Sequence, residues 1–337
     1  MSIINSQEKI LLAGSSGMVG SSIYKALKKN GYGDKSLGGE IYTPKRLDLN
    51  LLNTIEVINW FKTKNPSIVI IAAAKVGGIY ANFKNPADFI LENLKIQTNI
   101  IEAAFKSNVK RLIFLGSSCI YPKLSKQPIK EEYLLEGQLE ATNEYYAIAK
   151  IAGIKLCEAL NLQYGFDAIS LMPTNLYGPG DNYNYSDSHV LPSLIRKFWE
   201  AKKSGSNSVT CWGTGFPMRE FLHVDDLANA CLFALKKWNP KSNHAPIDDQ
   251  GNPILVLNVG CGSDISIKDL ANMISDEIGF KGQIIWDSSK PDGMMKKLLD
   301  INKISNLGWE PKIQLKEGIK KTILEFKKNF ANNKIRI

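Results

Sequence analysis

Two hydroxyls and a thiol follow one short apolar segment of the chain. Residues 111–115 read RLIFL, which is typical of a buried strand, and the next residues are Gly116, Ser117, Ser118 and Cys119. Strands of open parallel sheets carry functional residues at their carboxyl ends, although a lone cysteine there is more often a small buried hydrophobic residue. The segment is therefore a candidate site, and its residue types alone leave the reaction open.

A tyrosine and a lysine farther along the chain have the spacing of an acid–base pair. Tyr146 and Lys150 are four residues apart, so on a helix their side chains lie on one face, whereas Tyr145 would point elsewhere. An ammonium group favours the phenolate and lowers a phenol pKa that is ordinarily near ~10. Such a tyrosine could exchange a proton with a carbonyl or alcohol oxygen during hydride transfer. The spacing is common by chance, and it becomes specific only in a chain with a dinucleotide-binding loop.

Three glycines near the N-terminus predict such a loop. Gly14, Gly17 and Gly20 follow an apolar strand expected over 9–13 and open a helix expected over 18–29. In this context glycines let the backbone approach a pyrophosphate at the positive end of the helix. A mere tight turn is the alternative, and the flanking strand and helix favour nucleotide binding.

The residues after the second strand favour NADP over NAD. An acidic residue that reads the ribose of NAD normally ends this strand, but Glu40 begins the segment 40–43 and would lie at the wrong end. The other end carries Lys45 and Arg46, and an arginine can bind a 2′-phosphate with two parallel hydrogen bonds. The alternative is that both are solvated loop charges.

The elements that position these residues alternate between strand and helix. Apolar runs at 9–13, 68–73, 111–115 and 168–172 predict strands, and amphipathic segments at 52–64, 86–107, 145–165 and 190–203 predict helices. This alternation predicts an α/β fold with a doubly wound parallel sheet covered by helices on both faces. We expect a Rossmann domain over 1–178 plus about 222–262. A smaller α/β substrate lobe should comprise about 179–221 plus 263–337.

Composition excludes several classes of protein. The 337 residues are 44% hydrophobic, and the net charge of +9 comes from scattered lysines rather than a basic stripe, so no nucleic-acid partner is expected. The apolar runs are far shorter than the ~20 residues that span a bilayer, and the first residues do not resemble a signal peptide. Five cysteines lack metal-ligand spacing and only three histidines occur, so we expect no metal and a reducing cytoplasm.

Longer motifs identify a resemblance. The strings AAAKVGGI (72–79), LGSSCIYPK (115–123), YAIAKIAGIKLCE (146–158), MPTNLYGP (172–179), DSHV (187–190) and PMREFLHVDD (217–226) accompany the glycine loop. Together they resemble the extended short-chain dehydrogenase/reductase family, over about residues 9–325. They are most similar to its members that act on GDP-4-keto-6-deoxy-D-mannose. The resemblance implies a bifunctional 3,5-epimerase and 4-reductase that uses NADPH and makes GDP-L-fucose.

The resemblance also implies a role for each candidate residue. Ser117 would hydrogen-bond the C4 carbonyl, Tyr146 would protonate its oxygen, and Lys150 would tune Tyr146 and hold the nicotinamide ribose. Cys119 would be the base and His189 the acid that invert C3 and C5. A thiol with a pKa near ~8.5 can serve as a base if a nearby cation lowers that pKa.

Binding residues follow from the same resemblance. The cofactor would contact Gly14, Ser15, Ser16, Gly17, Met18, Val19, Gly20, Arg46, Asn50, Leu115, Gly116, Ser117, Ser118, Lys150, Pro173, Thr174, Asn175, Leu176 and His189. The nucleotide sugar would contact Lys197, Trp212, Arg219 and Asp292. The helices near 86–107 and 145–165 would build a homodimer.

Two departures from the family pattern and two alternative functions remain. Ser15 and Ser16 stand where the family often has a basic residue, so Arg46 would carry the 2′-phosphate contact alone. The segments 36–40 and 239–253 resemble surface insertions. One alternative is a 4-epimerase or dehydratase of another nucleotide sugar, but the former needs no Cys/His pair and the latter should carry Asp-Glu at 118–119. The other is a nucleotide sensor on an inactive scaffold, which should have lost part of the Ser/Tyr/Lys set.

Overall fold

The larger sheet is parallel throughout and has six strands. The computed structural model describes residues 2–290 and 292–337. In spatial order the strands are β2 (Glu40–Tyr42), β1 (Lys9–Ala13), β3 (Ile68–Ile71), β4 (Arg111–Leu115), β5 (Ala168–Pro173) and β9 (Val256–Val259). Every residue of the four strands from β3 to β9 is buried, which explains their continuous apolar sequences. The predicted doubly wound fold is confirmed.

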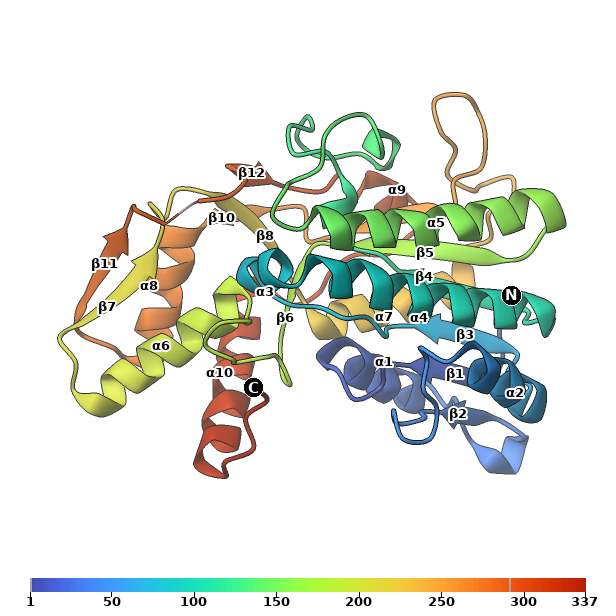
Figure 1. Ribbon diagram of the computed structural model, residues 1–337, viewed down its shortest axis with the longest axis horizontal. Coiled ribbons are helices and arrows are strands. Elements are labelled where there is room, and N and C mark those ends of the chain that lie inside the picture. The colour runs from blue at the N-terminus through green and yellow to red at the C-terminus, as the bar shows by residue number, and fades with distance from the viewer. Residues whose placement is uncertain (1, 291) are drawn as a thin grey trace.

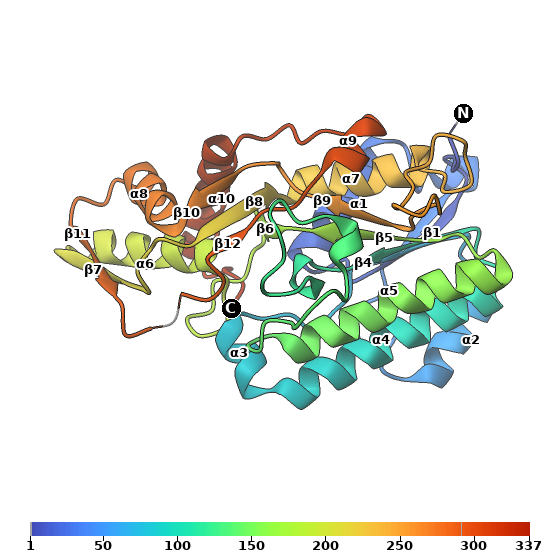
Figure 2. The ribbon, with the colours of Figure 1, turned by 90° about the horizontal axis from the view of Figure 1, so that it is seen from above.

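Helices cover both faces of this sheet (Figures 1 and 2). Helices α1 (Met18–Lys29) and α7 (Val224–Lys237) pack on one face, and α2 (Thr54–Lys64), α4 (Pro86–Lys106) and α5 (Glu144–Tyr164) on the other. Two separate clusters of buried apolar side chains result, one for each face. The predicted helices and strands are confirmed within two residues at each end, because glycine, proline and asparagine mark their boundaries.

A smaller lobe is built from three helices and short strands (Figure 1). Helices α6 (Val190–Ser204), α8 (Ile267–Ile278) and α10 (Leu315–Ala331) pack with the strand pair β7 (Ser208–Trp212) and β11 (Gln283–Asp287) around a third apolar cluster. Strand β8 (Met218–His223) pairs with β6 (Asn175–Tyr177), β10 (Asp264–Ser266) and β12 (Lys296–Lys297). Because β6 directly follows β5, β8 joins this lobe to the carboxyl edge of the large sheet.

The segment after β12 returns to the large sheet. Ile304 in the short helix α9 (Asn302–Asn306) and Trp309 belong to the apolar cluster that also contains α1 and α7 residues. This stretch of about residues 299–309 lies within the range that the sequence assigned to the substrate lobe. Within residues 2–290 and 292–337, none of the helices combines the length and the apolar character needed to cross a membrane.

Candidate active site

The predicted cofactor and catalytic segments meet at one edge of the large sheet. Strands β1, β3, β4 and β5 are adjacent and parallel, so the residues that follow them emerge side by side. These residues are the glycine loop, the loop 72–78, the segment 116–119 and the segment 174–176. Open parallel sheets bind ligands outside their carboxyl ends.

The glycine loop has the geometry that a pyrophosphate requires. Gly14 has φ +90°, and a side chain there would come within 2.6 Å of the Ala73 backbone nitrogen. A side chain on Gly20 would come within 2.1 Å of the Gly14 carbonyl oxygen. Gly17 is the N-cap of α1, without a side-chain cap and without an acidic residue in the first turn. The free N–H groups and positive end of α1 can therefore accept an anion.

Strand β2 runs in the direction that the sequence predicted, with Lys45 and Arg46 after its carboxyl end. Glu40 pairs with Lys9 at the start of β1, so it lies at the edge opposite the glycine loop. The turn 45–50 follows the correct end of β2, and the Arg46 side chain is exposed there. Asn50 accepts a hydrogen bond from the Leu52 nitrogen at 3.1 Å, which fixes the end of this turn.

The segment after β5 is held by the smaller lobe. The Thr174 nitrogen donates to the Val259 carbonyl oxygen at 3.0 Å. The Thr174 hydroxyl and the Asn175 amide both donate to the Glu220 carbonyl oxygen, at 3.3 Å and 2.8 Å. The predicted cofactor segment 173–176 is therefore fixed where the lobes join.

The predicted Ser, Cys, Tyr and Lys residues come together between β4 and α5. Ser117 caps a short 3₁₀ helix over 118–120 and accepts a hydrogen bond from the Cys119 nitrogen at 3.4 Å. Lys150 is 4% exposed, and its Nζ donates to the Leu115 carbonyl oxygen at 2.8 Å. The same Nζ lies 5.8 Å from the centre of the Tyr146 ring. Cys119 is close enough for its charge to raise the pKa values of both Tyr146 and Lys150.

Burial has the largest effect on the pKa values of Tyr146 and Lys150. It raises the pKa of Tyr146 well above its ordinary value, and the charge of Cys119 raises it further. The predicted lowering of the Tyr146 pKa by Lys150 is therefore wrong for this arrangement, because the ammonium donates to a carbonyl and sits over the ring. Burial also lowers the pKa of Lys150 to about 8, against the charge of Cys119. Tyr146 is therefore protonated at neutral pH.

The thiol of Cys119 has the cation that the sequence required, but burial outweighs it. Burial raises the pKa of Cys119, while the charge of Lys297, the Ser117 hydrogen bond and the charge of Lys150 all lower it. Lys297 is the largest of these opposing causes. Formation of a thiolate at Cys119 therefore depends on the positive charge around it.

His189 approaches the same edge from the smaller lobe. It is the N-cap of α6, and the loop before it is tied to the loop after β3 by a bond from the Gly78 nitrogen to the Asp187 carbonyl oxygen at 2.9 Å. A side chain on Gly78 would come within 2.9 Å of the Ser188 carbonyl oxygen. His189 has an exposed surface, yet burial by surrounding protein atoms lowers its pKa, and the charge of Lys297 lowers it further. Lys297 thus lies close to both predicted epimerisation residues.

The predicted substrate-binding residues cluster in the smaller lobe. Trp212 is 60% exposed, and Lys197 Nζ lies 5.6 Å from its ring centre. Asp292 accepts hydrogen bonds from the Thr214 nitrogen and hydroxyl, both at 2.7 Å, so it also shapes the turn after Trp212. Burial lowers the pKa of Arg219, and the charge of Asp292 opposes this. An exposed indole could stack on a nucleobase, and the cations beside it could bind a diphosphate.

Two further lysines, which the sequence did not predict as site residues, lie beside the predicted ones. Lys290 Nζ lies 5.7 Å from the Trp212 ring centre, and Lys297 of β12 pairs with Arg219 of β8. In the sequence, Lys297 is only one of many scattered lysines. Only the pairing of β12 with β8 reveals the difference, and a two-residue strand gives no periodic signal.

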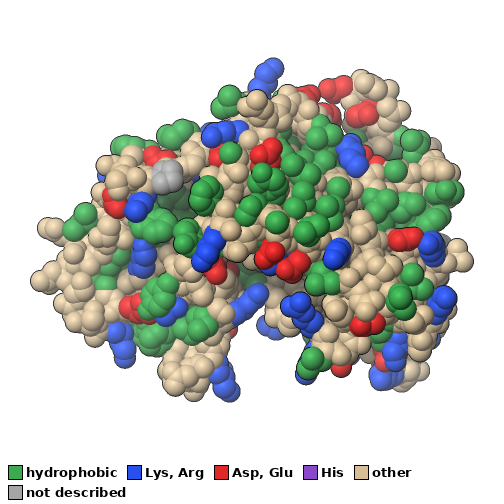
Figure 3. All heavy atoms as spheres, viewed as in Figure 1, with side chains coloured by type: hydrophobic (Ala, Val, Ile, Leu, Met, Phe, Trp, Pro, Cys, Tyr) green, Lys and Arg blue, Asp and Glu red, His purple; other side chains and the backbone are tan. Residues whose placement is uncertain are grey.

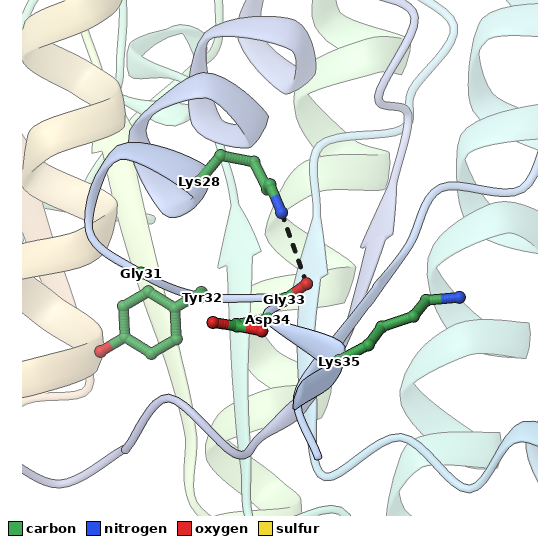
Figure 4. A pocket seen from close by; sticks show the side chains of 6 residues that line it. All are labelled: Lys28, Gly31, Tyr32, Gly33, Asp34 and Lys35. Atoms are coloured by element: carbon green, nitrogen blue, oxygen red, sulfur yellow. Dashed lines mark hydrogen bonds between the residues drawn. The ribbon is translucent and has the colours of Figure 1, made fainter. Parts of the chain in front are cut away.

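A surface depression near the C-terminal end of α1 is unrelated to this site (Figure 4). It is lined by Lys28, Gly31, Tyr32, Gly33, Asp34 and Lys35. Lys28 Nζ donates across it to the Gly33 carbonyl oxygen at 3.4 Å. The glycine loop lies at the other end of α1, a helix length of about 18 Å away. The depression adjoins the predicted insertion 36–40, and none of the predicted site residues lines it.

Comparison with known proteins identifies the family. The sequence profile of the NAD dependent epimerase/dehydratase family matches residues 10–246. The chain belongs to this family. The predicted membership of the extended short-chain dehydrogenase/reductases is thereby confirmed. The chain is 47% identical over 331 residues to GDP-L-fucose synthase 1 of Arabidopsis thaliana, and the alignment covers 98% of this chain and 97% of that protein.

Solved structures share the fold over the whole chain. A GDP-6-OMe-4-keto-L-xylo-heptose reductase from C. jejuni has a TM-score of 0.88 and 37% identity, covering 97% of this chain and 99% of that one. A GDP-L-fucose synthetase from Naegleria fowleri bound to NADP has a TM-score of 0.84 and 26% identity, covering 98% and 97%. The architecture of both lobes is therefore that of known nucleotide-sugar enzymes.

Proposed function

We propose that this protein is a bifunctional NADPH-dependent 3,5-epimerase and 4-reductase that converts GDP-4-keto-6-deoxy-D-mannose to GDP-L-fucose. One observation carries the proposal: Cys119 shares a buried site with Ser117, Tyr146 and Lys150, next to Lys297. The Arabidopsis relative supports the predicted activity, and the NADP-bound structure from Naegleria fowleri supports the predicted cofactor.

Reduction at C4 uses the hydroxyls at the sheet edge. Ser117 donates a hydrogen bond to the carbonyl oxygen, and Tyr146, whose raised pKa keeps it protonated, donates the proton to that oxygen. Lys150, anchored on the Leu115 carbonyl oxygen, orients the ring and presents charge to the ribose. NADPH, when bound at the glycine loop with Arg46 and Asn50 at its adenosine half, supplies the hydride.

Epimerisation uses the thiol and the imidazole. The C4 carbonyl acidifies the protons on C3 and C5, so each centre can lose a proton to form an enolate and regain one on the opposite face. Cys119 as thiolate removes the proton, and His189 delivers a proton from the other side. The positive charge of Lys297 favours the thiolate of Cys119. Burial and the charge of Lys297 lower the pKa of His189, which makes the protonated imidazole a stronger acid.

The nucleotide half of the substrate lies on the smaller lobe in this proposal. Trp212 offers an exposed ring for stacking on the base, and Lys197 and Arg219 offer charge to the diphosphate. Asp292 fixes the turn beside Trp212 and remains an acceptor for sugar or base hydroxyls. These contacts would hold the keto sugar toward the sheet edge.

The protein is also proposed to act as a cytoplasmic homodimer. Apolar side chains gather over α4, α5 and the short helix α3 (Ile79–Lys84) in Figure 3, including exposed Phe83, Leu91, Tyr145 and Leu162. Pairing this face with a second copy would bury it as a four-helix bundle. All five cysteines are free, in keeping with a reducing compartment.

A second candidate is a reductase of another GDP-4-keto sugar, because the C. jejuni heptose reductase shares the fold at a TM-score of 0.88. One reaction separates the two: purified protein, GDP-4-keto-6-deoxy-D-mannose and NADPH in D₂O, with NMR of the product. GDP-fucose with deuterium at C3 and C5 supports the proposal. Oxidation of NADPH with a deuterium-free, unepimerised product would favour the second candidate and reject the roles of Cys119 and His189.

A further inference from the structure

The C-terminal tail of the chain folds back onto the loop that faces the glycine loop. After α10, the Lys334 nitrogen donates to the Asn329 carbonyl oxygen at 2.8 Å, and the Tyr183 nitrogen donates to the Arg336 carbonyl oxygen at 2.8 Å. Ile335 packs against the apolar cluster of the smaller lobe. The C-terminal end consequently lies on the side of that lobe that faces the large sheet (Figures 1 and 2).

This arrangement brings the Arg336 guanidinium to the start of α1. Its Nη1 donates to the Gly180 carbonyl oxygen at 3.4 Å, and a methyl group placed on Gly17 would lie 4.0 Å from the same Nη1. A methyl group on Gly180 would lie 3.9 Å from the Met18 Cα. The tail and the loop 178–183 therefore stand over the N-terminus of α1, and the Arg336 side chain is exposed there.

The glycine loop itself supplies no positive side chain. Its residues between Gly14 and Gly20 are serine, methionine, valine and glycine, and its helix N-terminus has no side-chain cap. A pyrophosphate carries two negative charges, and backbone N–H groups with a helix dipole neutralise only part of them. A planar guanidinium can donate two parallel hydrogen bonds to a phosphate.

We propose that Arg336 binds the pyrophosphate of the dinucleotide cofactor, as the cationic partner of the glycine loop and the N-terminus of α1. The inference rests on the proposed use of NADPH at this loop. It assigns the end of the polypeptide, far from the glycine motif in sequence, to the cofactor site. Arg46, at the end of β2, keeps the separate role of binding the 2′-phosphate.

Two carboxylates, Asp181 and Glu325, lie near Arg336 and the Gly180 turn. Burial raises the pKa of Asp181 to about 7, and the charge of Arg336 opposes this rise. Glu325 accepts a hydrogen bond from the Gly180 nitrogen at 3.5 Å. Across residues 2–290 and 292–337, no carboxylate forms an ion pair with Arg336. Among the described residues the guanidinium makes one hydrogen bond, to the Gly180 carbonyl oxygen, which leaves further guanidinium donors for a phosphate.

Cofactor binding to the variants tests the assignment. NADPH and NADH are titrated separately into wild-type protein and into Arg336→Gln, Arg336→Lys, Arg46→Gln and Lys334→Gln, with binding followed by tryptophan fluorescence or calorimetry. Arg336→Gln should weaken both cofactors by a similar factor of about 10, because both contain the pyrophosphate and one charge-assisted contact is lost. Arg336→Lys should recover part of the loss. Lys334→Gln, two residues away with the same change of charge, should bind like wild type.

Each other outcome has a defined meaning. Unchanged binding of both cofactors to Arg336→Gln would overturn the assignment, and a loss confined to NADPH would move Arg336 to the 2′-phosphate. If Arg336→Gln proves less stable in thermal unfolding, recovery of binding by Arg336→Lys still supports the phosphate contact, and failure to recover contradicts it. If the wild-type protein binds neither cofactor, the proposed function fails independently of Arg336.

Discussion

Lys297 and Arg219 lie side by side, because the parallel strands β12 and β8 place these residues opposite each other. Burial and the charge of Arg219 both lower the pKa of Lys297, whereas the charge of Cys119 raises it. Two cations on adjacent strands, whose backbones run about 4.8 Å apart, favour anions in the space that both side chains face. Lys297 and Arg219 therefore form one positive edge of the candidate site.

Replacing Lys297 by methionine should raise the pKa of Cys119 further. Of the charges that favour the thiolate, Lys297 has the largest effect, so its loss should move the pH dependence of Cys119 alkylation to higher pH. Iodoacetamide modification followed by mass spectrometry measures this at each pH. Deuterium exchange at C3 and C5 should slow in parallel.

The neighbouring lysine provides a matched control. Lys296 points to Asp264, with Nζ 3.4 Å from Oδ2, and so serves the opposite side of β12. Lys296→Met should leave the alkylation profile of Cys119 unchanged. If the two variants shift the profile equally, the effect is one of general surface charge, and the role of Lys297 is rejected.

The two half-reactions should separate in two single variants. Cys119→Ser should prevent deuterium exchange at C3 and C5 while NADPH still binds, because its thiol lies apart from the glycine loop. Tyr146→Phe should slow NADPH oxidation by about 10²–10⁴-fold and still permit exchange, since only the proton donor to the carbonyl oxygen is lost. NMR in D₂O measures exchange, and absorbance at 340 nm measures oxidation.

Exchange at the wild-type rate in Cys119→Ser would show that another group is the base. Loss of exchange in Tyr146→Phe would mean that the phenol also stabilises the enolate. Tyr145→Phe is the control, because its side chain is 47% exposed on the next residue of the same helix. It should retain both activities.

Lys150 should lower the stability of the protein while it serves catalysis. Burial lowers its folded-state pKa from 10.5 to about 8, so between these values the unfolded chain binds more protons than the folded one. Stability should therefore rise as the pH increases from 8 to 10.5, and the full cost should persist below pH 8. Lys150→Met removes this cost but also the bond to the Leu115 carbonyl oxygen. We expect a net gain of about 1–2 kcal/mol at neutral pH.

Urea unfolding at neutral and alkaline pH checks this prediction. The gain of Lys150→Met over wild type should shrink as the pH rises, because deprotonation relieves the wild-type protein. Lys155→Met, which removes an exposed lysine paired with Glu158, should show no such trend. A pH-independent difference between Lys150→Met and wild type would contradict the buried ammonium as the cause.

The strands of the large sheet could be predicted because each is marked by a short apolar run of consecutive residues. The run IVII of β3 and the run RLIFL of β4 are apolar without interruption, as strands covered on both faces must be. The glycine loop could also be predicted, because at positions 14 and 20 any side chain would collide with the neighbouring backbone. Helix ends followed from residues such as Pro86 at the start of α4.

The charges of the site could not be predicted from the sequence in the same way. Lys297 acts beside Arg219 only through a tertiary strand pairing, and Arg336 reaches a carbonyl 156 positions earlier in the chain. The spacing of Tyr146 and Lys150 placed both on one helix face correctly. It gave no account of burial, and burial sets the direction of both pKa shifts.

Glu220 should prove essential to the junction of the two lobes. This carboxylate is fully buried, and its Oε1 accepts from the Cys261 and Gly262 nitrogens at 2.7 Å and 2.8 Å. Its Oε2 accepts from the Leu299 nitrogen at 3.1 Å, two residues beyond Lys297. A glutamine would turn its NH₂ group toward one of these donors. Glu220→Gln should therefore lower the free energy of unfolding by about 2 kcal/mol.

The same substitution should affect the substrate more than the cofactor, because the Leu299 bond fixes the strand that carries Lys297. We expect a higher KM for the nucleotide sugar in Glu220→Gln, with NADPH affinity close to wild type. Glu136→Gln, on an exposed turn, is the control for loss of one carboxylate and should change neither stability nor KM. If Glu220→Gln lowers stability but leaves KM unchanged, Glu220 only stabilises the fold. The β12–β8 pairing alone would then fix the position of Lys297.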